Sequence, residues 1–268
     1  MPTAEHFLAG LAAGGRAHLN AWLALPDPLV AETIARTSFD SLTLDFQHGA
    51  MTFSGMVAGI AGAMLVGKPS IVRVPLGDLG LAARALDAGA AGIVCPMVNS
   101  AADARALVDA VKFPPVGGRS WGPHRALVAS GLSRQEFLHR ANAKTFAFAM
   151  IETAAALDHL EAILGTPGID GVYIGPNDLC VSLTGGADVD PALPQVVAAI
   201  DRVAEAAKRH GRVAGIFANT TALAQDYARR GFSFISLGND LAFLRDRAEA
   251  VASAARGESA PLDERPAV

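Results

Sequence analysis

Short hydrophobic runs alternate along this chain with longer stretches in which apolar residues recur every three or four positions. The short runs are rich in valine, isoleucine, leucine and phenylalanine, as is typical of strands buried on both faces of a parallel sheet. The longer stretches, such as 78–89 and 101–112, have the period of amphipathic helices. The pattern predicts eight strands, at 19–25, 41–46, 70–74, 92–97, 146–151, 171–175, 212–218 and 232–238.

Eight alternating strand and helix units predict a (β/α)₈ barrel, the TIM barrel, built as a single domain. We expect the barrel to occupy residues 1–255 and the polar, proline-containing end at 256–268 to form a flexible tail. An open, doubly wound α/β sheet is the alternative. It usually needs fewer strands and often carries a glycine-rich fingerprint in its first turn, which this sequence lacks.

Charge and composition narrow the class of protein. The net charge is −4 and no basic stripe is present, so we expect no nucleic-acid partner. The N-terminus has no basic leader before its apolar part, and the longest uncharged apolar stretch, 57–67, is too short to span a bilayer. Cys95 and Cys180 lie in apolar segments. We therefore expect no membrane association, a buried helix at 57–67 and reduced thiols in the cytoplasm.

Polar residues follow four of the predicted strands, at the end where barrel enzymes build their active sites. The second strand ends in Asp45 and His48, the third carries Arg73, the fifth ends in Glu152 and the sixth runs into a turn that contains Asp178. We expect all five side chains to project into the same mouth.

Glu152 and Asp178 come from neighbouring strands, which lie about 4.8 Å apart in a parallel sheet. Two carboxylates without a nearby histidine or cysteine suit a hard divalent cation, Mg²⁺ or Mn²⁺ first and Co²⁺ next. The alternative is that each acid caps the helix after its strand. Two acids on adjacent strand ends favour the metal.

Arg73 lies among apolar neighbours, and a buried arginine needs an anion. That anion is either a substrate or the partner in a structural ion pair across the mouth. His48 is a candidate general base, since an imidazole suits that task near neutral pH. The alternative is a loop histidine packed against its neighbours. Asp45 would hold His48 in one tautomer or anchor its loop.

Two further segments carry candidate chemistry. Gly175, Pro176 and Asn177 form a turn whose backbone N–H groups could bind a substrate carboxylate. The glycine- and proline-rich segment 114–126 indicates a functional loop. No lysine lies within a predicted strand, which argues against imine-forming chemistry; the lysines are Lys68, Lys112, Lys144 and Lys208.

Six motifs stand out along the chain: D-x-x-H at 45–48, VRVP at 72–75, ALDAGAAGIVCPMV at 85–98, PP-x-G-x-R at 114–119, MIET at 150–153 and GVYIGPNDL at 171–179. In these motifs and in their order, the chain resembles the HpcH/HpaI family of metal-dependent, class II pyruvate aldolases. The resemblance covers roughly residues 8–250.

This resemblance implies a barrel that assembles as a hexamer, a trimer of dimers with helix swapping between subunits. It also implies roles for the residues. Glu152 and Asp178 look like the metal ligands, and Arg73 looks like the residue that holds the keto oxygen of pyruvate and stabilises the enolate. His48 looks like the catalytic base, acting through a metal-bound water, and Asp45 looks like the support of its loop.

The resemblance implies further site residues and two departures. Asp87 matches an acid that pairs with the catalytic histidine across a subunit interface, and Trp22 matches a pocket aromatic. Phe217 and the 114–126 loop are expected to shape substrate choice. The departures are Gln47, where a glutamate is common, and Asn177, where alanine is usual. They put the preferred aldehyde in doubt more than the type of reaction.

The expected function is that of a carbon–carbon lyase, which makes or cleaves 4-hydroxy-2-ketoacids from pyruvate or hydroxypyruvate and an aldehyde. One rival is a lyase acting on a CoA thioester, as in the citrate lyase β-subunit or malyl-CoA lyase. That reading requires a basic cluster for the CoA phosphates, which we do not find. The second rival is a catalytically silent barrel that binds ketoacids. Loss of Arg73 or His48 would favour it, and both residues are present.

Overall fold

The computed structural model describes residues 16–257 and contains a closed barrel of eight parallel strands in sequence order, with β1 pairing with β8. This confirms the predicted (β/α)₈ barrel. Each predicted strand boundary lies within two residues of the observed one. The strands are β1 (His18–Leu23), β2 (Ser41–Asp45), β3 (Ser70–Arg73), β4 (Gly92–Cys95), β5 (Phe146–Met150), β6 (Gly171–Ile174), β7 (Val213–Ala218) and β8 (Phe234–Asn239).

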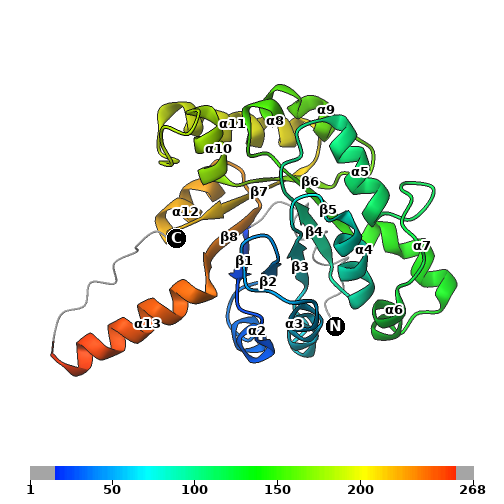
Figure 1. Cartoon of the computed structure of the whole chain (residues 1–268), viewed down its shortest axis with the longest axis horizontal. Coiled ribbons are helices and arrows are strands. Elements are labelled where there is room, and N and C mark those ends of the chain that lie inside the picture. The colour runs from blue at the N-terminus through cyan, green and yellow to red at the C-terminus, as the bar shows by residue number, and fades with distance from the viewer. Residues whose placement is uncertain (1–15, 258–268) are drawn as a thin grey trace.

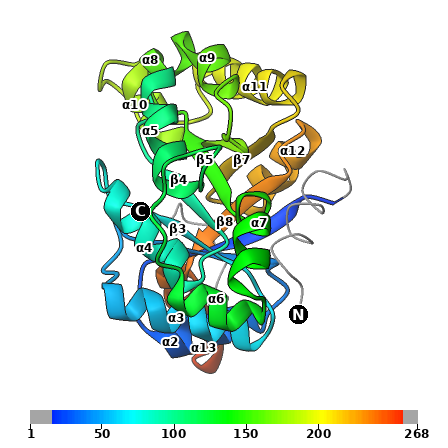
Figure 2. The same ribbon diagram turned by 90° about the vertical axis from the view of Figure 1, so that its right-hand side faces the viewer.

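Twelve helices in this described part connect the strands and surround them (Figures 1 and 2). The expected terminal parts at 1–15 and 258–268 lie outside the described residues. The helices are α2 (Pro28–Ala35), α3 (Phe53–Leu65), α4 (Leu79–Ala88), α5 (Ala101–Val111), α6 (His124–Ser130), α7 (Arg134–Lys144), α8 (Ala154–Asp158), α9 (Leu160–Leu164), α10 (Pro176–Leu183), α11 (Pro194–Arg209), α12 (Thr221–Arg229) and α13 (Asp240–Ala255).

Local sequence signals explain where several of these helices begin and which face they bury. The side chains of Thr52, Ser100 and Thr220 cap α3, α5 and α12 by accepting a hydrogen bond from the first turn. The apolar stretch 57–67 falls in α3, which buries one face, including Ile60, against the barrel. None of the described helices is long and apolar enough to cross a bilayer.

Side chains of successive strand residues point alternately into the barrel and toward the helices. Val72 and Ile93 belong to the outer core between strands and helices, whereas their neighbours Ile71 and Val94 face inward. The strands β3 and β4 are therefore largely apolar on both faces. This explains why the strands appear in the sequence as continuous hydrophobic runs.

Aromatic rings fill the barrel interior, and glycines on neighbouring strands make room for them. The inner cluster includes Phe148, Tyr173 and Phe234. A Cβ atom at Gly215 on β7 would lie 2.7 Å from the Tyr173 ring, and one at Gly171 on β6 would lie 2.8 Å from the Phe148 ring. The interior is thus a packed aromatic core that forms the floor beneath the mouth.

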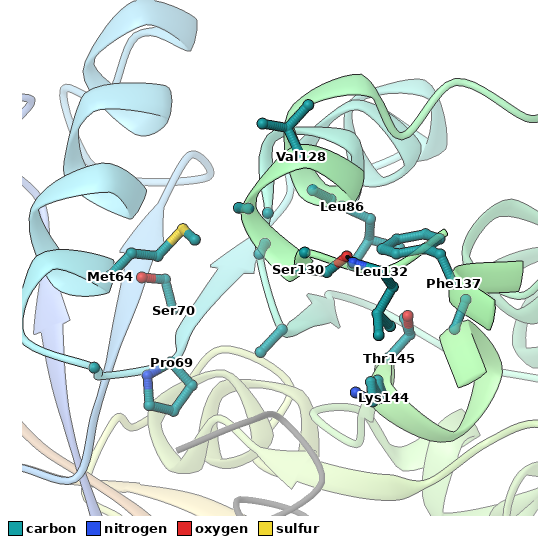
Figure 3. A pocket seen from close by; sticks show the side chains of 18 of the residues that line it. Met64, Pro69, Ser70, Leu86, Val128, Ser130, Leu132, Phe137, Lys144 and Thr145 are labelled. Atoms are coloured by element: carbon teal, nitrogen blue, oxygen red, sulfur yellow. Dashed lines mark hydrogen bonds between the residues drawn. The ribbon is translucent and has the colours of Figure 1, made fainter. Parts of the chain in front are cut away.

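The segment 114–126 lies at the end of the barrel opposite the mouth. It follows the C-terminus of α5, and its Arg119 lines a cavity of about 540 Å³ together with Ser70 and Thr145, which stand where β3 and β5 begin. Figure 3 shows this cavity between the starts of these strands and α6 and α7. Within one chain, this segment therefore does not reach the mouth, where we expected it to shape substrate choice.

We expect Gly215→Ala to destabilise the fold by about 1–3 kcal/mol, because the added methyl group forces the Tyr173 ring out of its packing. Urea denaturation followed by circular dichroism measures the change. Gly118→Ala is the matched control, since a Cβ there meets nothing closer than a carbonyl oxygen at 3.7 Å. Equal stabilities of the two variants would contradict the tight packing of the interior.

Candidate active site

Asp45 and Arg73 stand side by side at the ends of β2 and β3, where the register pairs them directly. Arg73 donates from Nε to Asp45 Oδ1 over 2.8 Å and from Nη2 to Oδ2 over 2.7 Å. Both residues are buried. The ion pair considered as one explanation of Arg73 is therefore present. The Nη1 group of Arg73 has no acceptor among residues 16–257, so the guanidinium keeps one donor group for a ligand.

Asp45 is also the anchor of its own loop. Its carboxylate accepts hydrogen bonds from the indole Nε1 of Trp22 at 3.1 Å and from the backbone N–H groups of Gln47 and His48 at 3.0 and 3.4 Å. Burial alone would raise the pKa of Asp45, but the hydrogen bonds and charge of Arg73 outweigh it and hold that pKa below its usual value. Of the two roles considered for Asp45, the structure contains the loop anchor.

His48 lies in this loop with its side chain exposed. Gly49 explains the sharp turn that follows, because a Cβ there would lie 2.4 Å from the Asp45 carbonyl oxygen and 2.9 Å from the Cα of Ala24. The next N–H, that of Ala50, donates to the Ala24 carbonyl over 2.8 Å. The loop that carries His48 is thus folded back onto the segment after β1.

Glu152 and Asp178 converge on one point beside Gly175. A Cβ added to Gly175 would lie 2.9 Å from Glu152 Oε2 and 3.4 Å from Asp178 Oδ2. Helix capping does not explain Glu152, because Thr153 caps α8. Asp178 lies in the first turn of α10, where a carboxylate meets the positive end of the helix dipole, but it provides no side-chain cap to that helix. The geometry therefore places both carboxylates where one ligand can meet them.

The electrostatics of this acid pair suit a cation. Burial raises the pKa of Glu152 to about 7, and the charge of Asp178 acts in the same direction. The N–H of Met97 and the charge of Arg73 oppose that shift. A cation between the two acids would offset both the burial cost and their repulsion. Among residues 16–257, no group of three or more histidine, cysteine, aspartate or glutamate side chains is arranged to hold a metal ion. A hard cation at Glu152 and Asp178 would therefore complete its coordination shell with other oxygen ligands.

Met97 is a site residue that the sequence did not reveal. We predicted that the fourth strand includes it, but β4 ends at Cys95, and Met97 adopts a left-handed φ of 55° that is rare outside glycine. In this conformation its N–H donates to Glu152 Oε1 over 2.8 Å. The hydrogen bond fixes one carboxylate oxygen and leaves Oε2 directed toward Asp178.

Aromatic side chains wall the mouth on the side of β1 and β7. The Arg73 guanidinium carbon lies 4.9 Å from the centre of the Trp22 ring, a cation–π distance. Phe217 meets the same ring edge-on at 5.6 Å, and Tyr173 lies 5.7 Å from it. Trp22 therefore contacts both the Arg73 guanidinium and the Phe217 ring.

The turn at 175–177 and the acid at position 87 have different surroundings. Pro176 is buried at the start of α10, while Asn177 is exposed beside Asp178, so the turn lies at the mouth. Asp87, on the outer helix α4, instead pairs with Arg119 over 2.6 Å. Within one chain the structure does not bring Asp87 to His48.

The four lysines all lie away from the mouth. Lys68 and Lys144 precede β3 and β5, Lys112 follows α5 and Lys208 lies in the last turn of α11. Lys112 is the buried one, and it pairs with Asp170 over 2.7 Å. None is placed to form an imine with a ligand in the mouth.

Comparison with known proteins identifies the family of this chain. The sequence model of the HpcH/HpaI aldolase/citrate lyase family matches residues 18–246. The hydroxypyruvate/pyruvate aldolase of Rhizorhabdus wittichii is 38% identical over 242 residues, covering 90% of this chain and 95% of the relative. The 4-hydroxy-2-oxovalerate aldolase of Rhodococcus jostii is 35% identical, and the match covers 90% of this chain and 92% of the relative.

Among solved structures, an HpcH/HpaI aldolase/citrate lyase family protein from Burkholderia cenocepacia superimposes with a TM-score of 0.85. It is 30% identical, and the match covers 94% of this chain and 99% of that one. The resemblance seen in the six motifs is therefore confirmed by sequence and by structure over nearly the whole chain. The chain is a carbon–carbon lyase that belongs to the HpcH/HpaI aldolase/citrate lyase family.

Proposed function

We propose that this enzyme is a metal-dependent aldolase that makes or cleaves 4-hydroxy-2-ketoacids, with pyruvate or hydroxypyruvate as the donor and an aldehyde as the acceptor. The observation that carries the proposal is the placement of Arg73. Asp45 fixes its guanidinium beside Trp22, near enough to Glu152 for its charge to oppose the rise in that acid's pKa. The two relatives above are named as a hydroxypyruvate/pyruvate aldolase and a 4-hydroxy-2-oxovalerate aldolase, which supports the same donor.

Glu152 and Asp178 are the proposed ligands of the divalent cation, Mg²⁺, Mn²⁺ or Co²⁺. Their convergence beside Gly175 and the raised pKa of Glu152 support this assignment. When bound, the cation acts as a Lewis acid that polarises the keto group of a ketoacid and acidifies its neighbouring C–H bond. The N–H groups at the start of α10, around Asn177, are proposed to bind the ketoacid's carboxylate, and the absence of a side-chain cap on α10 supports this role.

Arg73 is proposed to stabilise the negative charge that develops on the keto oxygen. Asp45 holds Nε and Nη2, so Nη1 is the donor that remains for that oxygen. Because the guanidinium is already fixed, little reorganisation is required when charge appears, and such preorganised donors often supply the largest catalytic term.

His48 is proposed to accept the proton from the donor's methyl or hydroxymethyl carbon, directly or through one water. The carbon then adds to the aldehyde, and the reverse sequence cleaves the 4-hydroxy-2-ketoacid. The anchoring of its loop by Asp45 supports this role, since a base must be held within reach of the proton.

A CoA-thioester lyase is the nearest rival. We favour a free ketoacid because the relatives above, at 35% and 38% identity, are named for aldolases of such acids. A catalytically silent barrel is disfavoured because the arginine, histidine and both acids are all present at the mouth.

Helix α13 supports a proposal for assembly, a homo-oligomer in which this helix docks on a second copy. It extends away from the barrel (Figure 1), with Leu241, Leu244 and Val251 each at least half exposed. Together with α2 it lines an apolar groove. Such apolar surface favours burial against a partner subunit. A hexamer built as a trimer of swapped dimers would also bring Asp87 of one subunit to His48 of another.

We also propose a cytoplasmic location. Cys95 and Cys180 are both buried and unpaired. Free buried thiols are usual in compartments that keep cysteine reduced.

Arg73→Ala should lower both aldol cleavage and solvent deuterium exchange into the methyl group of pyruvate at least about 100-fold, because it removes the fixed positive charge at the keto oxygen. Proton NMR of pyruvate in D₂O measures the exchange. Arg36→Ala is the matched control, because Arg36 is exposed on α2 and pairs only with Glu32. Substantial exchange by the Arg73 variant would overturn the proposed role.

Chelation with EDTA should abolish activity, and added Mg²⁺, Mn²⁺ or Co²⁺ should restore it. Glu152→Gln should also weaken Mn²⁺ binding, measured by isothermal titration calorimetry, by at least about tenfold, because it removes one of two charged ligands. Glu161→Gln, an exposed glutamate on α9, is the control and should bind Mn²⁺ normally. Full activity in EDTA would argue against metal dependence.

Leu244→Arg should shift the enzyme to smaller species in light scattering, since it places a charge in the proposed subunit contact. Leu65→Arg offers a comparison at another exposed leucine, 74% accessible at the end of α3. An unchanged mass for the Leu244 variant would exclude α13 as the assembly helix.

A further inference from the structure

Asp240 is a completely buried carboxylate that no arginine or lysine between residues 16 and 257 neutralises. Three backbone N–H groups satisfy it instead. Oδ1 accepts from Ala24 over 3.0 Å and from Leu241 over 2.9 Å, and Oδ2 accepts from Leu25 over 2.9 Å. Burying a carboxylate is costly unless its oxygens are paired in this way.

Only one of these hydrogen bonds belongs to the helix that Asp240 begins. An acid in the first turn usually serves its own helix by meeting the positive end of the dipole. Asp240 instead accepts two hydrogen bonds from the backbone N–H groups of Ala24 and Leu25, which lie 216 and 215 residues away in sequence, in the loop after β1. The cap of α13 is supplied separately by Asn239, whose side chain accepts from Ala242. The Asp240 side chain therefore binds the loop after β1, while Asn239 caps the helix.

The β1 loop is the surface on which the His48 loop is folded. Ala24 contributes its carbonyl to the Ala50 N–H and its Cα to the close packing against Gly49. Pro26, two residues on, packs just as closely against Gly55 at the start of α3. A shift of the Ala24 backbone would thus be passed directly to the residue that follows His48.

The start of α13 is itself held firmly to the barrel. Asn239 ends β8 and pairs with Trp22 of β1. Gly238, with a left-handed φ of 61°, lets the Phe243 ring pack where a side chain would lie, with a Cβ there only 2.7 Å from the ring. A displacement of the first turn of α13 would therefore also move the Asp240 carboxylate.

We propose that Asp240 is a positioning residue for His48: it fixes the backbone of residues 24 and 25, on which the His48 loop rests, to the first turn of α13. The inference rests on the proposed role of His48 as the base. It adds a physical link between proton transfer and the helix proposed for assembly. Asp240 touches neither substrate nor cation in this arrangement, and acts only through the loop.

The test uses Asp240→Asn, whose amide nitrogen cannot accept the hydrogen bond from Leu25. We expect kcat for deuterium exchange into pyruvate to fall about tenfold, because small displacements of a catalytic group cost this much or more. KM for pyruvate and the Mn²⁺ affinity should change less than twofold, since Arg73 ends β3, Glu152 follows β5 and Asp178 lies in α10, all outside the loop that Asp240 contacts. Asp246→Asn, on the same helix and paired with its neighbour Arg245, is the control and should leave kcat unchanged.

A second arm isolates the path through His48. The His48→Ala enzyme is assayed with imidazole in solution, alone and combined with Asp240→Asn. If Asp240 acts only through the His48 loop, the second substitution leaves the imidazole-supported rate unchanged. A tenfold fall in that rate would overturn the inference, as would a loss confined to KM. Wild-type exchange by His48→Ala alone would instead refute the proposed base.

The melting temperature of Asp240→Asn, together with its Mn²⁺ affinity, verifies that the variant is folded. Should it not fold, Asp240→Ser leaves room for a water to reach Leu25 and is assayed in the same way. An unchanged kcat in a folded variant overturns the positioning role.

Discussion

The buried pair of Asp45 and Arg73 is the interaction on which the arrangement of the mouth depends. Removing two charges from water is expensive, and it is tolerated when geometry and additional hydrogen bonds compensate for the lost hydration. Here one carboxylate receives two bonds from the guanidinium, one from an indole and two from the backbone of the next loop. The same contacts that stabilise the charge therefore orient the arginine, the tryptophan and the histidine loop together.

Much of the fold was predictable because it depends on periodicity alone. Strands buried on both faces appear as continuous apolar runs, and eight of them alternating with helices leave few alternatives to a closed barrel. The acids at 152 and 178 were also identifiable, since parallel strands bring their carboxyl ends to one rim. These inferences needed only the order of residues along each strand.

The contacts that depend on backbone conformation or on cross-strand register were not predictable. Nothing in the sequence indicates that Met97 is left-handed, yet this conformation supplies the N–H that holds Glu152. Asp45 could have faced His48, and only the register with Arg73 decides otherwise. Asp240 gave no signal, because its two partners in the β1 loop lie more than 200 residues away. The loop at 114–126 looked like part of the site, but the direction of α5 takes it to the other end of the barrel.

Different strands supply the charged and the uncharged side chains of the mouth. The charged groups lie at or just after the ends of β2, β3, β5 and β6, whereas β1 and β7 carry the uncharged rings of Trp22 and Phe217. On the proposed assignment of the site, a substitution at Phe217 would change the shape of the uncharged wall and leave every charged side chain of the mouth in the sequence. Substrate size and the charge of the pocket could then vary separately, because they depend on different strands.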